Sequence, residues 1–247
     1  MKKISFLNYK GGVGKTTTLL NIAKGLVNQN KKVLLIDLDG QCNSTNHLID
    51  NDYKISLPDL LLNNEKTNEA IINTKSGIDI IPCSISMESV LNMIQVNPTI
   101  RNDVLLNGII KKINNHYDYI LFDCPPQLNY FTVNVILISD KLVVPVEADQ
   151  MSIDGFNNTI KFINQTSDNY EIAIDYILLS NKVNRNKIDN KFNNDMRDSA
   201  FNQFNQTIRY QAKPIREASL EKQFVIDKNE PISNDFKELV NEFIKIV

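Results

Sequence analysis

Apolar residues in this chain form short continuous runs instead of alternating with polar residues. Such runs are typical of strands that are covered on both faces of a sheet. They predict strands at residues 4–8, 33–37, 78–81, 119–123, 141–146 and 172–179. Between these strands apolar residues recur at helical spacing, which predicts helices around residues 17–26, 101–115, 129–139 and 154–165.

The alternation of predicted strands and helices indicates the fold class. It is typical of an α/β fold with a doubly wound, mainly parallel sheet flanked by helices. No tract rich in Pro, Gly or Ser and no internal repeat interrupts the pattern, so we expect a single domain over residues 1–247. Ligands of such folds bind beyond the carboxyl ends of the strands, and candidate site residues are expected there.

The first predicted strand and helix enclose the segment KGGVGKTT, residues 10–17. It matches the phosphate-binding loop G-x-x-x-x-G-K-[ST], except that Tyr9 stands where the first glycine belongs and Lys10 follows it. The glycines allow backbone N–H groups to converge on phosphate oxygens, Lys15 would bind the β- and γ-phosphates, and Thr16 would bind Mg²⁺. A solvated turn is the alternative. The strand, loop and helix in this order favour a P-loop NTPase of the deviant Walker A type.

The second lysine of the loop, Lys10, has no evident role at the nucleotide that Lys15 binds. Two lysines five residues apart in such a loop can reach two nucleotides. We therefore expect Lys10 to neutralise a γ-phosphate presented by a facing subunit, in a homodimer that forms on ATP binding.

Acidic residues follow two of the predicted strands. Asp123 ends a strand and precedes Cys124-Pro125-Pro126, as expected of a Walker B aspartate that holds Mg²⁺ through a water, although a cap or turn aspartate is the alternative. Asp37 and Asp39 lie one residue apart and would point to the same side if their strand continued. We expect Asp37 in the outer shell of the metal and Asp39 to orient the attacking water, unless one of them only caps a loop.

Composition and charge exclude several classes of protein. The net charge of −2 and the pI of about 5.8 argue against a globally basic nucleic-acid binder, so any DNA affinity must come from a local surface. The three cysteines form no CxxC pair, as expected of a reduced cytosolic protein without a structural metal. No apolar stretch approaches twenty residues and no signal peptide is evident, so we expect a cytoplasmic protein without membrane spans.

One segment differs in charge from the rest of the chain. Residues 181–216 contain eight basic and three acidic residues, a local excess of +5. A solvated helical face is the usual meaning of such a run. The contrast with the acidic remainder of the chain favours contact with DNA.

The loop and the two acidic segments together resemble the ParA family of DNA-partition ATPases, the deviant-Walker group that also includes MinD. Residues 10–17 are similar to the family's K-G-G-x-G-K-T-T loop, residues 37–45 (DLDGQCNST) to its D-x-D-P-Q-x-N-x-T motif, and residues 117–127 (YDYILFDCPPQ) to its Walker B stretch. The resemblance covers nearly the whole chain. It implies an ATPase that uses Mg²⁺ and acts in plasmid or chromosome partition.

The resemblance also implies roles for particular residues. Lys10 would reach across an ATP-sandwich dimer, and Asp39 would be tied to hydrolysis. ATP-bound dimers of the family bind DNA without sequence preference, which implies nucleoid association, and a centromere-bound ParB-type protein stimulates their turnover. Arg185 falls at the family's basic position after the strand predicted at 172–179, and either Lys213 or Arg216 takes the later DNA-contacting place. The expected nucleotide-binding residues are Lys10, Gly11, Gly12, Val13, Gly14, Lys15, Thr16, Thr17 and Asn181, and the expected metal site is Thr16, Asp37 and Asp123.

The chain departs from the family pattern at a few places. Tyr9 replaces a usual Gln, and Gly40 replaces a usual Pro, which leaves the chemistry intact and loosens the loop around residue 40. The late basic stretch, residues 208–218, differs from the family's I-P-R-N-V-R-L-S-E-A-P. Because the loop opens at Lys10, there is no room for an N-terminal helix-turn-helix, and we expect the short class of the family.

Three other classes share this type of loop. A MinD-like membrane-cycling ATPase needs a basic amphipathic terminal helix. Residues 235–247 are amphipathic but have a local charge of −1, so we expect that helix to pack on the sheet. An iron–sulfur carrier needs paired cluster cysteines, and only Cys124 lies near the predicted nucleotide site. A metabolic kinase or ligase needs a substrate pocket that the sequence does not reveal.

Overall fold

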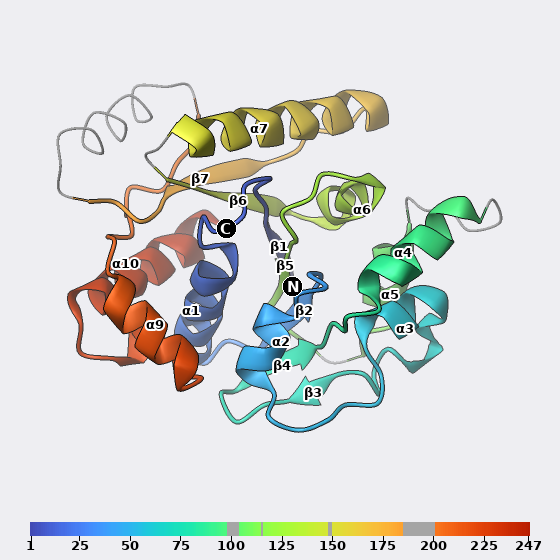
Figure 1. Ribbon diagram of the computed structural model, residues 1–247, viewed down its shortest axis with the longest axis horizontal. Coiled ribbons are helices and arrows are strands. Elements are labelled where there is room, and N and C mark those ends of the chain that lie inside the picture. Colours follow the sequence, from blue (N-terminus) through green and yellow to red (C-terminus); the bar gives the residue numbers. More distant parts are fainter. Residues whose placement is uncertain (98–103, 115, 148–149, 185–200) are drawn as a thin grey trace.

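The computed structural model describes residues 1–97, 104–114, 116–147, 150–184 and 201–247, with only the backbone described at 150–154. Its centre is a seven-stranded sheet in the order β3-β4-β2-β5-β1-β6-β7 (Figure 1). All neighbouring strands are parallel except β3, which runs antiparallel to β4 at one edge. The strands are β1 (Lys2–Phe6), β2 (Val33–Asp37), β3 (Ile72–Asn73), β4 (Ile78–Ile81), β5 (Tyr119–Asp123), β6 (Lys141–Val146) and β7 (Tyr176–Ser180).

Helices cover both faces of this sheet (Figure 1). One face carries α1 (Lys15–Asn28), α9 (Ala212–Leu220), the short helix η2 (Val225–Asp227) and α10 (Pro231–Ile246). The other face carries α3 (Leu57–Leu62), α4 (Met87–Val96), α5 (Leu105–Ile110), α6 (Tyr130–Ile138) and α7 (Gln150–Tyr170). Helix α2 (Asn43–Leu48) follows β2, and the short helix η1 (Asn64–Lys66) follows α3.

The strands contribute alternate residues to two separate cores. In β2, Leu34 and Ile36 belong to the core under α3–α7, whereas Val33 and Leu35 belong to the core under α1 and α10. Because both faces are buried, every strand position can be apolar, which accounts for the continuous runs in the sequence. The predicted doubly wound, mainly parallel α/β fold is confirmed.

The sequence pattern placed several element boundaries wrongly. Strand β7 begins at Tyr176 and not at residue 172, because Glu171 adopts a left-handed conformation (φ 52°) that ends α7, and residues 172–175 form a connection. Strand β1 covers residues 2–6 instead of 4–8, since backbone pairing with β5 begins at Lys2. Within the described residues, α5 is shorter than the helix predicted at 101–115, and the edge strand β3 was not predicted at all.

The amphipathic terminal helix packs as predicted. In α10, the apolar residues Phe236, Leu239, Val240 and Phe243 are buried in the core that also contains α1. The apolar face of α10 is therefore already covered within the chain. No helix in the described ranges has the length and apolar character needed to cross a membrane.

Candidate nucleotide-binding site

The carboxyl ends of three adjacent strands bring the predicted site residues together. Strand β5 lies between β1 and β2, and Asp123 is in register with Phe6 on one side and with Asp37 on the other. The loop that follows β1 therefore lies beside both carboxylates. This juxtaposition follows from the parallel sheet, because parallel strands end at the same edge.

The phosphate-binding loop owes its shape to two left-handed glycines. Gly12 and Gly14 have φ values of 79° and 88°, which favour glycine. Helix α1 begins directly after Gly14, and its first backbone bond runs from the N–H of Thr18 to the carbonyl of Gly14, 2.9 Å away. The N–H groups of the preceding helical residues therefore have no partner within the helix and point out of its N-terminus, as phosphate binding requires.

Lys15 lies beneath the loop. Lys15 is only 7% exposed, and its Nζ donates to the carbonyl oxygens of Asn8 (3.1 Å) and Lys10 (3.3 Å). Burial lowers the pKa of Lys15, while the nearby carboxylate of Asp123 opposes that shift. The ammonium group is thus held within the curve of the loop, where the β- and γ-phosphates are expected.

Helix α7 holds the outer arm of the loop. A Cβ atom on Gly155 would come within 2.9 Å of the Cβ atom of Lys10, so only glycine allows this close approach. On the other side, the buried Asn8 donates to the carbonyl of Pro145 (2.7 Å) and accepts from the N–H of Lys10 (2.9 Å). Lys10 is therefore placed at the rim by α7 and by the end of β6. No local sequence pattern marks Gly155 or Asn8, because their role depends on contacts between distant segments.

Thr16 and Asp123, two residues of the expected magnesium site, form a hydrogen bond with each other. The Thr16 hydroxyl donates to one carboxylate oxygen of Asp123 (3.2 Å), and the Ser44 hydroxyl donates to the other (2.6 Å). Hydroxyl and carboxylate oxygens are the ligands that Mg²⁺ prefers, and one or two carboxylates suffice because the ion keeps several waters. The residues present fit this ion. Ser44 was not predicted, although it lies in the D-x-D segment, because its hydroxyl reaches Asp123 only through the fold.

Asp37 anchors the start of α2. One of its carboxylate oxygens accepts from the N–H (2.9 Å) and the hydroxyl (2.7 Å) of Thr45, and the other accepts from the N–H of Asp39 (3.1 Å). Asp37 is fully buried, whereas Asp39 is half-exposed and accepts from the N–H of Gln41 (2.9 Å). Asp37 thus ties the loop to the sheet, and Asp39 stands in that loop nearer to solvent.

Burial perturbs both inner carboxyl groups. Burial and then the neighbouring charge of Asp123 raise the pKa of Asp37 to about 7. Burial raises the pKa of Asp123 to about 6, against the hydrogen bonds from Ser44 and Thr16 and the charge of Lys15. Two carboxylates at adjacent strand ends repel one another, and this repulsion destabilises the site. A cation between these carboxylates and the phosphates would reduce that repulsion.

We expect the metal-free protein to lose stability as pH rises. The pKa of Asp123 is 3.8 without the fold and about 6 within it, so between these values the folded state binds more protons. The free energy of unfolding therefore falls from about pH 4, and it levels off only above about pH 7, because the pKa of Asp37 is raised in the same way. Asp123→Asn, which stays neutral, should gain up to about 3 kcal/mol over the unchanged protein at pH 8. Urea unfolding of both proteins with a chelator at pH 5 and pH 8 measures this, and parallel pH profiles would contradict it.

Asn181 contacts the loop from the end of β7. Its Nδ2 donates to the carbonyl of Val13 (2.7 Å), and the residue is only 5% exposed. A Cβ atom on Gly14 would come within 2.3 Å of that nitrogen. Asn181 therefore lies against the backbone of the predicted nucleotide-binding loop, and its amide supports the loop directly.

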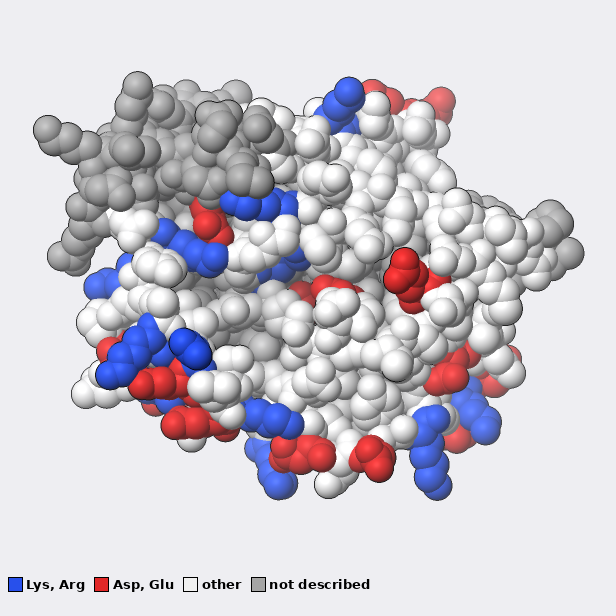
Figure 2. Space-filling model, in the orientation of Figure 1, with Lys and Arg blue, Asp and Glu red and all other residues white. Residues whose placement is uncertain are grey.

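The basic residues of the 181–216 segment have different surroundings. Arg185 lies outside the described residues. Lys213 and Arg216 are exposed on α9, with Glu217 3.9 Å from the Lys213 ammonium. Figure 2 shows basic and acidic groups side by side at the end of the molecule where Figure 1 places α9. Arg209 instead forms two hydrogen bonds with Asp235 (2.6 and 2.7 Å), so its charge is neutralised within the chain.

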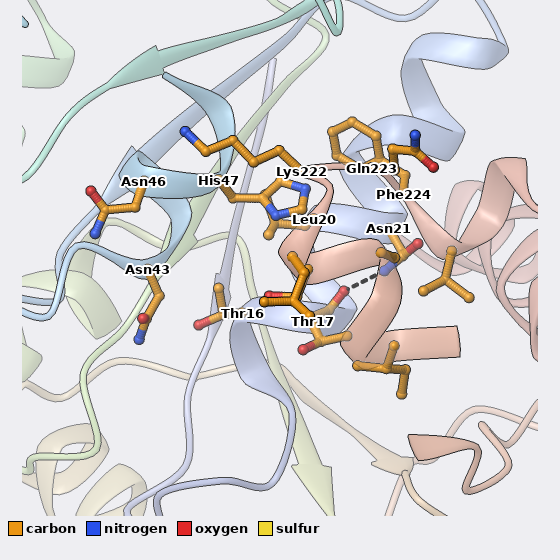
Figure 3. Close-up of a pocket in the computed structure, with 15 residues that line it drawn as sticks. Thr16, Thr17, Leu20, Asn21, Asn43, Asn46, His47, Lys222, Gln223 and Phe224 are labelled. Carbon is orange, nitrogen blue, oxygen red and sulfur yellow. Dashed lines mark hydrogen bonds between the residues drawn. The ribbon is translucent and has the colours of Figure 1, made fainter. Parts of the chain in front are cut away.

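An open pocket of about 520 Å³ connects the loop with α9 (Figure 3). Thr16, Thr17 and Asn21 of α1 form one wall, and the side chain of Asn21 donates to the carbonyl of Thr17 (2.8 Å). Residues of α2, of α9 and of the segment after α9 form the other walls, where the rings of His47 and Phe224 meet edge to face at 5.1 Å. The start of α1, helix α2 and the basic helix α9 therefore share one cavity.

Known proteins resemble this chain in sequence and in fold. A family model described as an AAA domain matches residues 1–176. The sporulation initiation inhibitor protein Soj of Bacillus subtilis is 35% identical over 185 residues, which cover 72% of each chain. The chromosome partitioning protein ParA of Caulobacter vibrioides is 30% identical over 204 residues, covering 80% of this chain and 76% of that protein.

A solved structure shares the fold over the full length. The putative plasmid partition protein BB_S35 of Borrelia burgdorferi, described as bound to AMPPNP, superposes with a TM-score of 0.83 and covers 100% of this chain and 99% of its own, at 22% identity. The region that the family model matches, residues 1–176, contains the loop and both acidic segments, which carried the resemblance. The chain therefore belongs to the ParA family of deviant-Walker P-loop ATPases.

Proposed function

We propose that this chain is a Mg²⁺-dependent ATPase of DNA segregation that dimerises on ATP, binds DNA without sequence preference in the cytoplasm and is released from the nucleoid by partner-stimulated hydrolysis. The observation that carries the proposal is the meeting of the two-lysine loop with Asp37, Asp39 and Asp123 at one sheet edge. The names of the relatives, Soj and ParA, support the role in segregation. The partner would be a ParB-type centromere-binding protein.

The arrangement of groups suits phosphoryl transfer to water. Backbone N–H groups at the start of α1 and the ammonium of Lys15 would hold the phosphates in place. Bound Mg²⁺, held by Thr16 and by Asp123 through water, would neutralise charge on the transferred group. Asp39, in the loop beside the site, would orient the attacking water. No arginine finger is evident near the loop in the described part of the chain, so turnover without a partner is expected to be slow.

ATP-dependent dimerisation should depend on Lys10. Its place at the rim, between the loop and α7, suits a contact with the γ-phosphate of a facing subunit. We expect ATP to produce a dimer and ADP to leave a monomer, and we expect Lys10→Ala to remain monomeric with ATP while still binding it. Light scattering coupled to size exclusion checks both, with Lys31→Ala as a control of equal charge. A Lys10→Ala protein that dimerises with ATP would remove this assignment.

DNA binding should depend on nucleotide and on salt. A dimer doubles the number of basic surfaces on one duplex, and each neutralised phosphate releases counterions with a log–log slope of about −0.9. We expect Lys213→Ala/Arg216→Ala to weaken ATP-dependent binding of a random-sequence duplex and to flatten the salt slope by roughly one unit for each phosphate that is no longer neutralised. Lys54→Ala/Lys75→Ala, which removes equal charge from exposed positions outside α9, is the matched control. Equal effects of the two double variants would mean that α9 is only a solvated face; the variant Arg185→Ala tests the other predicted contact.

A further inference from the structure

Lys182, a lysine of the basic segment 181–216, holds the phosphate-binding loop. Lys182 follows Asn181 at the end of β7 and has a left-handed backbone, with φ 55°. Its ammonium donates to the carbonyl of Gly12 and pairs with the Glu147 carboxylate at 2.6 Å, next to the end of β6. The two side chains are 30% and 20% exposed, so this pair is partly shielded from water.

The two adjacent side chains act on two adjacent peptide units of the loop. Asn181 binds the carbonyl of Val13 and Lys182 binds the carbonyl of Gly12. All described peptide bonds are trans, so the N–H of each unit points opposite to its carbonyl. When the carbonyls of Gly12 and Val13 turn toward β7, the N–H groups of Val13 and Gly14 turn away from it. Neither of these N–H groups donates to another described residue.

The carboxylate of Glu147 explains why the Lys182 ammonium stays bound to the backbone carbonyl of Gly12. An ammonium beside a phosphate site would otherwise be attracted to the phosphates themselves. Pairing with Glu147 neutralises its charge and sets its direction toward Gly12. The unusual left-handed conformation of Lys182 is maintained by its surroundings, in which the Lys182 N–H donates to the Asn181 side chain (3.0 Å).

We propose that Lys182, oriented by Glu147, is a positioning residue that sets the direction of the loop N–H groups for the phosphates of ATP and ADP. The inference rests on the proposed function, because it assigns a role within the same nucleotide site. It predicts an effect on binding that is similar for ATP and ADP and that appears in KM more than in kcat, since ground state and transition state use the same N–H groups.

The chain offers a matched control for this pair. Lys141 pairs with Asp175 at 3.0 Å and donates to the carbonyl of Ile246 at 3.0 Å. It therefore makes the same two kinds of contact, an ion pair and a hydrogen bond to a backbone carbonyl, at the opposite end of β6 and β7 from the loop. Lys182→Met and Lys141→Met each remove one positive charge, one ion pair and one hydrogen bond to a backbone carbonyl. Only the first should affect nucleotide binding.

The experiment measures calorimetric affinity for ATP and ADP, steady-state kinetics and thermal unfolding for the unchanged protein and each variant. We expect Lys182→Met to lower the affinity for ATP and for ADP about tenfold. Lys182→Arg should restore part of the lost affinity, and Glu147→Gln should also lower the affinity for both nucleotides. The double variant Lys182→Met/Glu147→Gln should lose no more nucleotide affinity than Lys182→Met alone, because the two residues act as a unit. Lys141→Met should shift the unfolding temperature at least as much as Lys182→Met does, and it should leave the affinities for ATP and ADP unchanged.

Other outcomes would overturn the inference. Affinities of Lys182→Met equal to those of Lys141→Met mean that Lys182 is only a surface partner of Glu147. If Lys182→Met does not fold, Lys182→Arg and Glu147→Gln decide, and unchanged affinities in both count against the inference. Amide hydrogen exchange of the loop peptide without nucleotide should accelerate in Lys182→Met, and unchanged exchange contradicts the positioning role directly. Failure of the unchanged protein to bind either nucleotide would instead refute the proposed function, which separates the two results.

Discussion

Lys15→Ala is expected to leave no detectable ATP binding or hydrolysis. In the folded chain this ammonium is buried beneath the loop and held by two loop carbonyls, so it meets the phosphates already desolvated and in place. Charge-assisted hydrogen bonds in such surroundings are the strong ones, and alanine would leave the phosphate charge uncompensated in a low-dielectric site. We expect the affinity to fall by at least about a hundredfold, measured by calorimetry with ATP and Mg²⁺.

A second lysine of the same helix controls for charge and for helix stability. Lys24 lies on α1 more than two turns from the loop, where it donates to the carbonyl of Ser76 and lies 3.9 Å from Asp227. Lys24→Ala should fold and bind ATP like the unchanged protein. Unimpaired binding in Lys15→Ala would exclude the loop as the nucleotide site.

Asp39→Ala is expected to bind ATP like the unchanged protein but not to hydrolyse it. Asp39 lies in the loop after β2 and touches neither Lys15 nor Thr16 by a hydrogen bond in the described residues, so phosphate binding should not depend on it. If it orients the attacking water, turnover should fall by about 10²- to 10⁴-fold. Single-turnover hydrolysis and ATP affinity, measured on the same protein, separate the two effects.

The variant Asp39→Asn separates chemistry from loop structure. An asparagine oxygen can still accept from the N–H of Gln41 and so preserve the local turn, but it carries no negative charge. We expect Asp39→Asn to be as inactive as Asp39→Ala and to unfold at the same temperature as the unchanged protein. Hydrolysis restored by asparagine would show that Asp39 only shapes the loop, and undiminished turnover in Asp39→Ala would remove it from the mechanism.

Residue order alone determined the fold class and the centre of the site. Strands that are covered on both faces must be apolar at every position, so β2, β5 and β6 were visible as uninterrupted runs. The phosphate-binding loop was equally visible, because its glycines and Lys15 act through local backbone geometry within one short segment. Asp37 and Asp123 could be assigned to the same edge because parallel strands share the direction of their carboxyl ends.

Only the tertiary structure decided which distant groups support that site. Ser44 reaches Asp123, Gly155 lies against Lys10, and Lys182 pairs with Glu147 across segments that no local pattern connects. The same holds for charge: Arg209 belongs to the basic segment by sequence but is neutralised by Asp235 of α10. A hydrogen bond or an ion pair forms only between atoms within about 3 Å of each other. The packing of the two helical layers on the sheet sets these distances. Composition and periodicity do not specify that packing.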